Sequence, residues 1–209
     1  MRFRTITVAA AATASLLLAS AAYAQNDQPG HTSPKPGSNS ETMSALQDST
    51  AGVVGKISAE MTHTTKGFVN AAAMSDMYEV EAGNIAAQRG SKAIQDFGKK
   101  MVVAHTETTN QLKSILASNK INVTPPAALD NRRQGMIDNL RGAKGADFDH
   151  RYIEQQVAAH KEAEILMRGY SKDGDNAAVK SFAGETLPKV SDHLAMAEQL
   201  EKGLNVATK

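Results

Sequence analysis

Four side chains, one carboxylate and three imidazoles, are of types that bind transition metals in proteins. They are Glu79, His105, His160 and His193, and each lies near the middle of a separate helical stretch of the sequence. A set of three imidazoles and one carboxylate suits Zn²⁺, Cu²⁺, Fe²⁺ or Mn²⁺. The four residues therefore predict a site for one transition-metal ion, provided that the fold brings them together.

Helical periodicity places each of these side chains on an inward face. Residues four, seven and eleven positions apart share one face of an α-helix. By this rule the face neighbours of His105 and His193 are mainly apolar, those of His160 are partly polar, and Glu79 lies in a stripe of small and apolar residues. Residues at the middles of four packed helices meet at one height, so we expect the four side chains to converge in the core.

A buried hydrogen-bond network is the alternative interpretation of the same four residues. An unpaired polar group inside a protein costs on the order of 1–3 kcal/mol, so buried polar groups find partners. Glu79 can accept hydrogen bonds from one or two of the histidines, and the layer would then fix the register of the helices without a metal. The sequence leaves both interpretations open.

A dinuclear iron centre is not expected at this layer. Di-iron carboxylate bundles carry Glu-x-x-His on two helices and a Glu on each of the other two. The positions three residues before the histidines are instead valines: Val102, Val157 and Val190. Of the other acidic residues, Asp76 is placed near the edge of the inner surface, and Asp149 and Glu164 a turn or more from its centre. We therefore expect at most one metal ion and no ferroxidase activity.

Other catalytic patterns are missing from the sequence. It contains no cysteine nucleophile, no phosphate-binding glycine loop and no context for a nucleophile elbow. The nine methionines are spaced as core residues more than as copper ligands. Whether the protein is an enzyme, and through which catalytic residues, stays open. An enzyme acting on a small molecule would need a cavity beside the histidines, lined by Tyr152, Gln156 and Asp149.

Four long helices and one short helix are predicted to position these residues. The long helices span about residues 68–88, 92–118, 147–170 and 176–204, and the short helix spans about residues 130–142. Gly90 is expected to end the first helix, and Ser91 and Asp175 to cap the second and the fourth. Pro188 removes a backbone donor inside the last helix and should kink it.

The connections between the helices predict the fold. Residues 88–91 and 171–175 are short enough to make antiparallel hairpins, whereas residues 119–146 are long enough to return along a helix of about 38 Å. The expected fold is an all-α, ferritin-like four-helix bundle of two antiparallel hairpins joined by a long crossover. An up-down-up-down bundle with a bulky third loop is the alternative.

The first 24 residues have the pattern of a secretory signal peptide. Arg2 and Arg4 precede an apolar run, and Ala22-Tyr23-Ala24 provides small residues for cleavage. Cleavage after Ala24 predicts a periplasmic or secreted protein that makes no stable membrane insertion, and an uncleaved anchor is the less favoured alternative. The chain contains no cysteine, which excludes a lipoprotein anchor and disulfides.

A polar linker is predicted between the leader and the bundle. Residues 25–66 are rich in Gln, Asn, Ser, Pro and Gly as far as residue 50, a composition typical of disorder, and leave room for a short helix after it. The bundle is assigned to residues 67–204 and a tail to residues 205–209. The chain has 23 Lys and Arg and 22 Asp and Glu, and no basic patch outside the leader predicts nucleic-acid binding.

Four stretches of the chain resemble the bacterial "domain of unknown function 4142" family over about residues 67–204. They are FVNAAAMSDMYEVEAGNIAAQRGS, FGKKMVVAHTETTNQLKSI, ADFDHRYIEQQVAAHKEAEILM and FAGETLPKVSDHLAMAEQL. They include Glu79 and the three histidines. The resemblance implies a ferritin-like fold and export, and it carries no established activity. The family usually has Asp before the second-helix histidine, where this chain has Ala104, which weakens any proposal of a second metal.

Two functions from different classes follow from these features. The first is an exported bundle protein that binds one metal ion through the Glu/His layer. The second is a non-enzymatic envelope or stress-associated interaction or scaffold protein, in which the layer is a structural network.

Overall fold

The computed structural model describes residues 48–49, 52 and 62–207; the predicted leader and most of the predicted linker lie outside these ranges. The described part is all-helical, as predicted. Its long helices are α2 (Thr65–Arg89), α3 (Lys92–Ser118), α5 (Gly145–Asp173) and α6 (Ala177–Ala207), and its short helix is α4 (Asn131–Gly142). α6 continues through Pro188. Among the described residues, no helix has the length and apolar character needed to cross a membrane.

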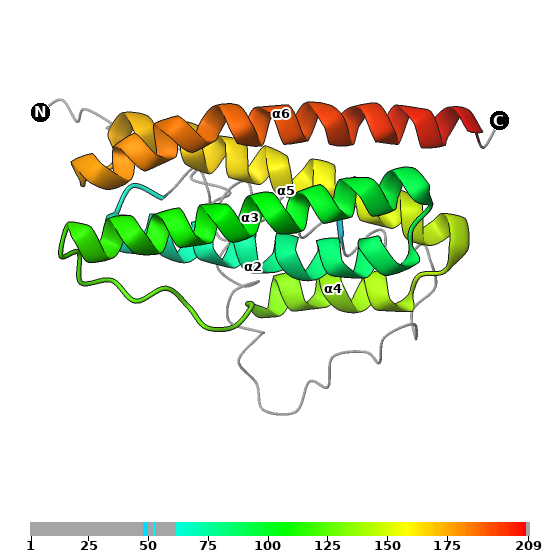
Figure 1. Cartoon of the computed structure of the whole chain (residues 1–209), viewed down its shortest axis with the longest axis horizontal. Helices are drawn as coiled ribbons and strands as arrows, with labels where there is room; N and C mark the ends of the chain where they lie inside the picture. The colour runs from blue at the N-terminus through cyan, green and yellow to red at the C-terminus, as the bar shows by residue number, and fades with distance from the viewer. Residues whose placement is uncertain (1–47, 50–51, 53–61, 208–209) are drawn as a thin grey trace, which may run out of the picture. The chain divides into compact units, whose positions relative to one another are not determined.

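The long helices pack as two hairpins, α2 with α3 and α5 with α6 (Figure 1). α2 also packs on α5, and α3 on α6, so the four helices enclose a common core, while α4 lies against α2 and α5. The backbone N–H of Ser91 donates to Asp149 Oδ1 at 3.1 Å, which places the starts of α3 and α5 at the same end. The connection that contains α4 therefore runs back along the bundle from the end of α3 to the start of α5 (Figure 1).

At the opposite end of the bundle, where α2 begins and α5 ends, Asp175 connects these two helices. The sequence predicted a different role for this residue. Asp175 was expected to cap α6, but the cap is Asn176, whose Oδ1 accepts from the Val179 backbone N–H at 3.2 Å. Asp175 Oδ1 instead accepts from the Thr65 N–H at 2.8 Å and from the Tyr170 hydroxyl at 2.9 Å. The carboxylate thus joins the start of α2 to the end of α5, a long-range contact that local capping rules do not describe.

Two apolar clusters fill the core, one toward each end of the bundle. One contains Met101, Val157 and Ala197. The other contains Ala163 and Val190 together with Leu112 and Phe182. On α3, α5 and α6 the predicted histidines lie between members of the two clusters. A polar layer thus crosses the middle of the core, and the apolar packing on both sides excludes bulk water from it.

α2 and α3 approach each other closely at Gly83 and Gly98. A Cβ atom added to Gly98 would lie 2.8 Å from the carbonyl oxygen of Gly83 and 2.9 Å from Ala86 Cβ, so a larger residue does not fit. Asp76 lies two helical turns before Gly83, and His105 two turns after Gly98. The glycine contact therefore sets the register at which Asp76 and His105 meet across the two antiparallel helices.

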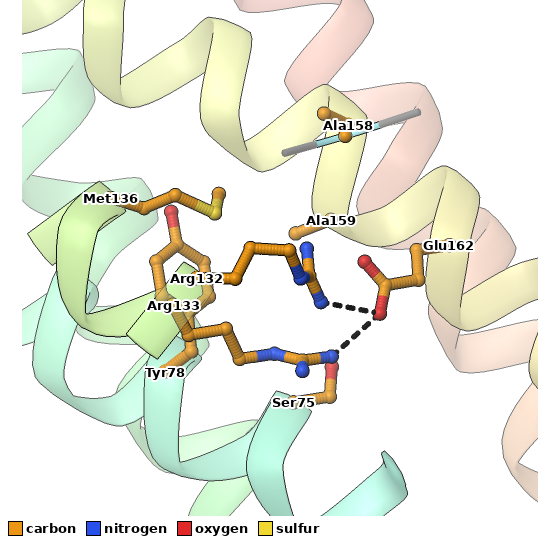
Figure 2. Close-up of a pocket in the computed structure, with 9 residues that line it drawn as sticks. Ser75, Tyr78, Arg132, Arg133, Met136, Ala158, Ala159 and Glu162 are labelled. Carbon is orange, nitrogen blue, oxygen red and sulfur yellow. Dashed lines mark hydrogen bonds and ion pairs between the residues drawn. The ribbon is translucent and has the colours of Figure 1, made fainter. Parts of the chain in front are cut away.

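α4 is fastened to α5 by ion pairs beside a cavity of about 10 Å³. Figure 2 shows Arg132 and Arg133 of α4 directed at Glu162, whose Oε1 accepts from them at 2.9 and 2.6 Å. Ser75 and Tyr78 of α2 line the same cavity (Figure 2). The connection that contains α4 is therefore held against both hairpins, through α5 and α2, near the middle of the bundle.

Asp48, which falls in the predicted linker, is buried against α4 and α5. Its carboxylate accepts hydrogen bonds from Asn139 Nδ2 at 2.9 Å, Gln155 Nε2 at 2.8 Å and Arg151 Nη1 at 3.3 Å. Gln155 Oε1 in turn accepts from the Tyr78 hydroxyl at 2.8 Å. Burial raises the pKa of the Asp48 carboxyl, against the lowering by these donors.

Replacement of Gly98 by Ala tests the close approach of α2 and α3. Overpacking against fixed backbone atoms is expected to lower the free energy of unfolding by about 1–3 kcal/mol. Gly169→Ala in α5 is the matched control, because a Cβ atom there meets nothing within 4 Å, and the higher helix propensity of Ala favours it by up to about 1 kcal/mol. Urea unfolding measures both; equal stability of the two variants would contradict the proposed contact.

Candidate metal centre

Three of the four predicted residues bring their rings together in the polar layer. The side chains are His105 from α3, His160 from α5 and His193 from α6, and their ring centroids lie 5.6, 5.8 and 5.5 Å apart in pairs. One ring nitrogen from each lies within 4.8 Å of the other two. All three residues are buried, with exposed fractions of 5, 1 and 8%. The prediction that they converge in the core is confirmed.

One nitrogen of each ring is buried without a hydrogen-bond partner. These atoms are His105 Nε2, His160 Nε2 and His193 Nδ1. A buried polar atom without a partner costs on the order of 1–3 kcal/mol, and folded proteins contain few of them. Three such atoms on three rings whose centroids lie within 5.8 Å of one another point to a shared ligand, and a cation that accepts three nitrogen lone pairs would satisfy all of them.

The opposite nitrogens of two rings are held by hydrogen bonds. His105 Nδ1 lies 2.8 Å from Asp76 Oδ1, and His160 Nδ1 lies 2.9 Å from the carbonyl oxygen of Gln156. Both acceptors require the proton on Nδ1, and a neutral imidazole then carries its lone pair on Nε2. A hydrogen bond of this kind sets the tautomer and the orientation of a metal-binding histidine.

Asp76 is closer to this layer than the sequence suggested. It was placed near the edge of the inner surface, but it is only 4% exposed, and its second carboxylate oxygen accepts from Thr109 Oγ1 at 3.0 Å. α3 covers it because α2 and α3 pack so closely at their glycines. Its position one turn before Glu79 and two turns before Gly83 was the feature of the sequence that could have indicated its burial beside the layer.

Glu79 lies in the layer beside His160 and is 1% exposed. Its Oε2 accepts from Gln156 Nε2 at 2.7 Å, and its Oε1 is 3.8 Å from His160 Nδ1. The cluster of nitrogens within 4.8 Å comprises the three histidines without this carboxylate, so a ligand role for Glu79 stays a prediction. Burial raises the pKa of Glu79 to about 7, against the lowering by the charge of His105 and the Gln156 hydrogen bond.

Two of the histidines are held in the neutral form that binds metals. Burial, with the charge of His105, lowers the pKa of His160 to about 3. Burial, with the charges of His105 and Lys100, lowers the pKa of His193 to about 4. Burial also lowers the pKa of His105, but the hydrogen bond that its Nδ1 donates to Asp76 and the charges of Glu79 and Asp76 outweigh burial and raise the pKa.

The other inner carboxylates have partners away from the layer. Asp149 accepts from the Ser91 backbone N–H, and Glu164 Oε1 accepts from Ser191 Oγ and Arg168 Nη2, both at 2.8 Å. Asp149 thus joins α5 to the start of α3, and Glu164 joins α5 to α6 and to the next turn of its own helix. This agrees with their predicted position a turn or more from the centre of the layer. This leaves Asp76 and Glu79 as the carboxylates in contact with the histidines in the described part of the chain.

A cavity of about 20 Å³ lies beside two of the histidines. Its inner wall includes His105, His193 and Asp76 with apolar side chains of α2, α5 and α6: Ala72, Ala163, Leu166, Met167 and Val190. Its more exposed residues come from α2, α3 and α6: Ser75, Ala104, Thr108 and Lys189. This lining differs from the Tyr152, Gln156 and Asp149 expected for an enzyme, and sequence periodicity gave no sign of it. The Tyr152 hydroxyl and Gln156 Oε1 are also buried without a partner.

Comparison with known proteins identifies the family. A family model described as "Domain of unknown function (DUF4142)" matches residues 54–200, and the chain belongs to this family. No curated protein and no solved structure matches the chain. The matched region contains Asp76, Glu79 and all three histidines of the layer.

The neutral state of His160 makes the stability of the metal-free protein depend on pH. In the unfolded chain His160 takes up a proton below about pH 6.5, but in the folded chain its pKa is about 3. Its contribution to stability is therefore present above pH 6.5 and is lost as the pH falls toward 3. The associated slope is at most about 1.4 kcal/mol per pH unit.

His160→Gln is expected to reduce that slope between pH 6 and 4 by up to about one proton. Urea unfolding at several pH values, in the presence of a chelator, measures the slope for both proteins. The comparison uses slopes because the substitution also changes the absolute stability. An unchanged slope would show that His160 is protonated in the folded protein.

Proposed function

We propose that this family member is an exported, ferritin-like bundle protein that binds one transition-metal ion through His105, His160 and His193. The observation that carries the proposal is the set of three buried ring nitrogens without partners, on rings about 5.5–5.8 Å apart. Three imidazoles suit Zn²⁺, Cu²⁺, Fe²⁺ or Mn²⁺. Each ring comes from a different helix, so one ion would also join three of the four long helices.

The hydrogen bonds of the layer favour a metal over a purely structural network. A network would use Glu79 to accept hydrogen bonds from the histidines. Its Oε2 is instead bonded to Gln156, and the nearby His160 Nδ1 is bonded to the Gln156 carbonyl. The bonds present orient His105 and His160 from outside and leave the inward nitrogens unpaired, which is the arrangement of ligand and supporting residue in metal sites.

A single ion is favoured by the supply of carboxylates. Asp76 is engaged by His105 and Thr109, which leaves Glu79 as the carboxylate adjacent to the rings. A dinuclear centre needs several bridging carboxylates. Glu79 would serve as a fourth ligand or as a charge that balances the ion, and both roles require its ionised form.

The bundle type and the compartment are further parts of the proposal. Helix directions support a ferritin-like arrangement, because α3 and α5 begin at the same end and the segment between them returns along the bundle. Export is supported by the leader pattern of residues 1–24. A mature protein that begins at Gln25, identified by mass spectrometry of the periplasmic fraction, is the expected result, and an intact leader on cytoplasmic protein would contradict export.

Metal titration of the untagged protein tests the metal site. Calorimetry with Zn²⁺ or Co²⁺ is expected to give one ion per chain. Thermal unfolding should shift upward, since a ligand at about 100 times its Kd stabilises the folded state by about 2.7 kcal/mol. His105→Ala, His160→Ala and His193→Ala should each weaken binding by about a hundredfold or more. If all three bind the ion as the wild type does, the proposed site is wrong.

Two further variants separate the roles within the layer. His150→Ala is the matched control, because His150 lies in the second turn of α5 outside the cluster, and it should leave affinity unchanged. Asp76→Asn keeps the shape of the side chain but removes the charge that orients His105, and loss of such support typically weakens binding by about 10–100-fold. An Asp76→Asn affinity equal to wild type would exclude this supporting role.

A further inference from the structure

We propose that the metal ion keeps one open coordination position, which binds a single small ligand through the cavity beside His105 and His193. The ligand class is water, hydroxide or a monovalent anion of two or three atoms. This inference rests on the proposed metal site and adds to it an exchangeable ligand and its route of entry.

The cavity reaches the site from one side only of the layer. It is lined by His105 and His193, and its apolar wall belongs mainly to the cluster around Ala163 and Val190. Glu79 and Gln156 do not line it. A Glu79 carboxylate bound to the ion would therefore leave the cavity side vacant, and so would coordination by the three histidines alone. Metal sites with three protein ligands and a vacant fourth position bind and exchange small ligands.

The size of the cavity limits what can enter. A volume of about 20 Å³ is little more than the roughly 10–15 Å³ needed to hold one water molecule. A linear anion that points one end at the ion can extend toward the mouth, where Ser75 of α2, Ala104 and Thr108 of α3 and Lys189 of α6 line the cavity. A ring the size of imidazole does not fit without movement of buried side chains such as Leu166 and Val190, which are 2 and 4% exposed.

The lining of the cavity favours water or an anion over a cation. Lys189 stands at the mouth, with its ammonium 3.7 Å from Glu107 Oε1. The inner wall is mostly apolar, and its carboxylate, Asp76, is bonded to His105 Nδ1 at 2.8 Å and to Thr109 Oγ1 at 3.0 Å. The Thr108 hydroxyl at the mouth already donates to the Ala104 carbonyl at 2.8 Å. An entering anion would be stabilised by the bound divalent ion and by Lys189. Its lone pair forms the new bond to the metal, a water molecule leaves, and no electron is transferred.

Cobalt and azide provide the test on the full mature protein. Co²⁺ bound by three histidines should give visible absorption bands, and azide should shift these bands in a saturable way. Imidazole at the same concentrations should not. Without Co²⁺ bands that depend on the three histidines, the proposed metal site itself is wrong. With such bands but no response to azide, the metal site stands and the open position is wrong.

A pair of alanine variants tests the route of entry. Ala104 lies at the half-exposed mouth of the cavity, whereas Ala117 of the same helix is exposed and outside the cavity. Ala104→Leu narrows the mouth and is expected to weaken azide binding by about tenfold or more while Co²⁺ binding is kept. Ala117→Leu should change neither. Equal azide affinity in the two variants would overturn the assignment of this cavity as the route.

Discussion

The hydrogen bonds on the outer sides of two imidazole rings determine what the core of this bundle can bind. Asp76 holds His105 and the Gln156 carbonyl holds His160, each at Nδ1. In the neutral form each of these rings carries its lone pair on Nε2, and both Nε2 atoms are buried without a partner among the described residues. The layer is costly in free energy by itself, and the two apolar clusters on either side of it must supply the stability that keeps it buried.

The charges of the buried side chains support a cation in the layer, as the positions of the histidines do. Two carboxyl groups, Asp76 and Glu79, are buried beside three imidazoles, and burial raises the pKa of both. Without a cation, the layer is close to neutral only when protons on the imidazoles or on the carboxyl groups offset the charges of the two carboxylates. A divalent ion would balance both carboxylates in their ionised forms and would release the proton that Glu79 holds near pH 7. Metal binding at such a site is coupled to proton release.

Periodicity predicted the convergence of the histidines because each lies on a long helix with a well-marked face. It misplaced Asp76, since a helical repeat gives a direction around one axis and does not give the distance to the neighbouring helix. That distance is set by the contact of Gly83 with Gly98, which brings α3 over Asp76. Asp48 was missed for a related reason. Composition describes whether a segment can form its own core, and Asp48 is instead buried in a polar pocket that α4 and α5 provide.

The packing of the two hairpins determines how Asp76 supports His105 and which helices line the cavity beside it. Within the α2/α3 hairpin the facing glycines bring the backbones into contact, and this close approach lets Asp76 support His105. α3 and α6 belong to different hairpins and pack on each other less extensively than the helices within a hairpin do. The cavity has its more exposed residues on α2, α3 and α6, and Ala104 leaves space there that a longer side chain would fill. The contact that supports His105 and the cavity proposed to admit a small ligand thus arise from one arrangement of two hairpins.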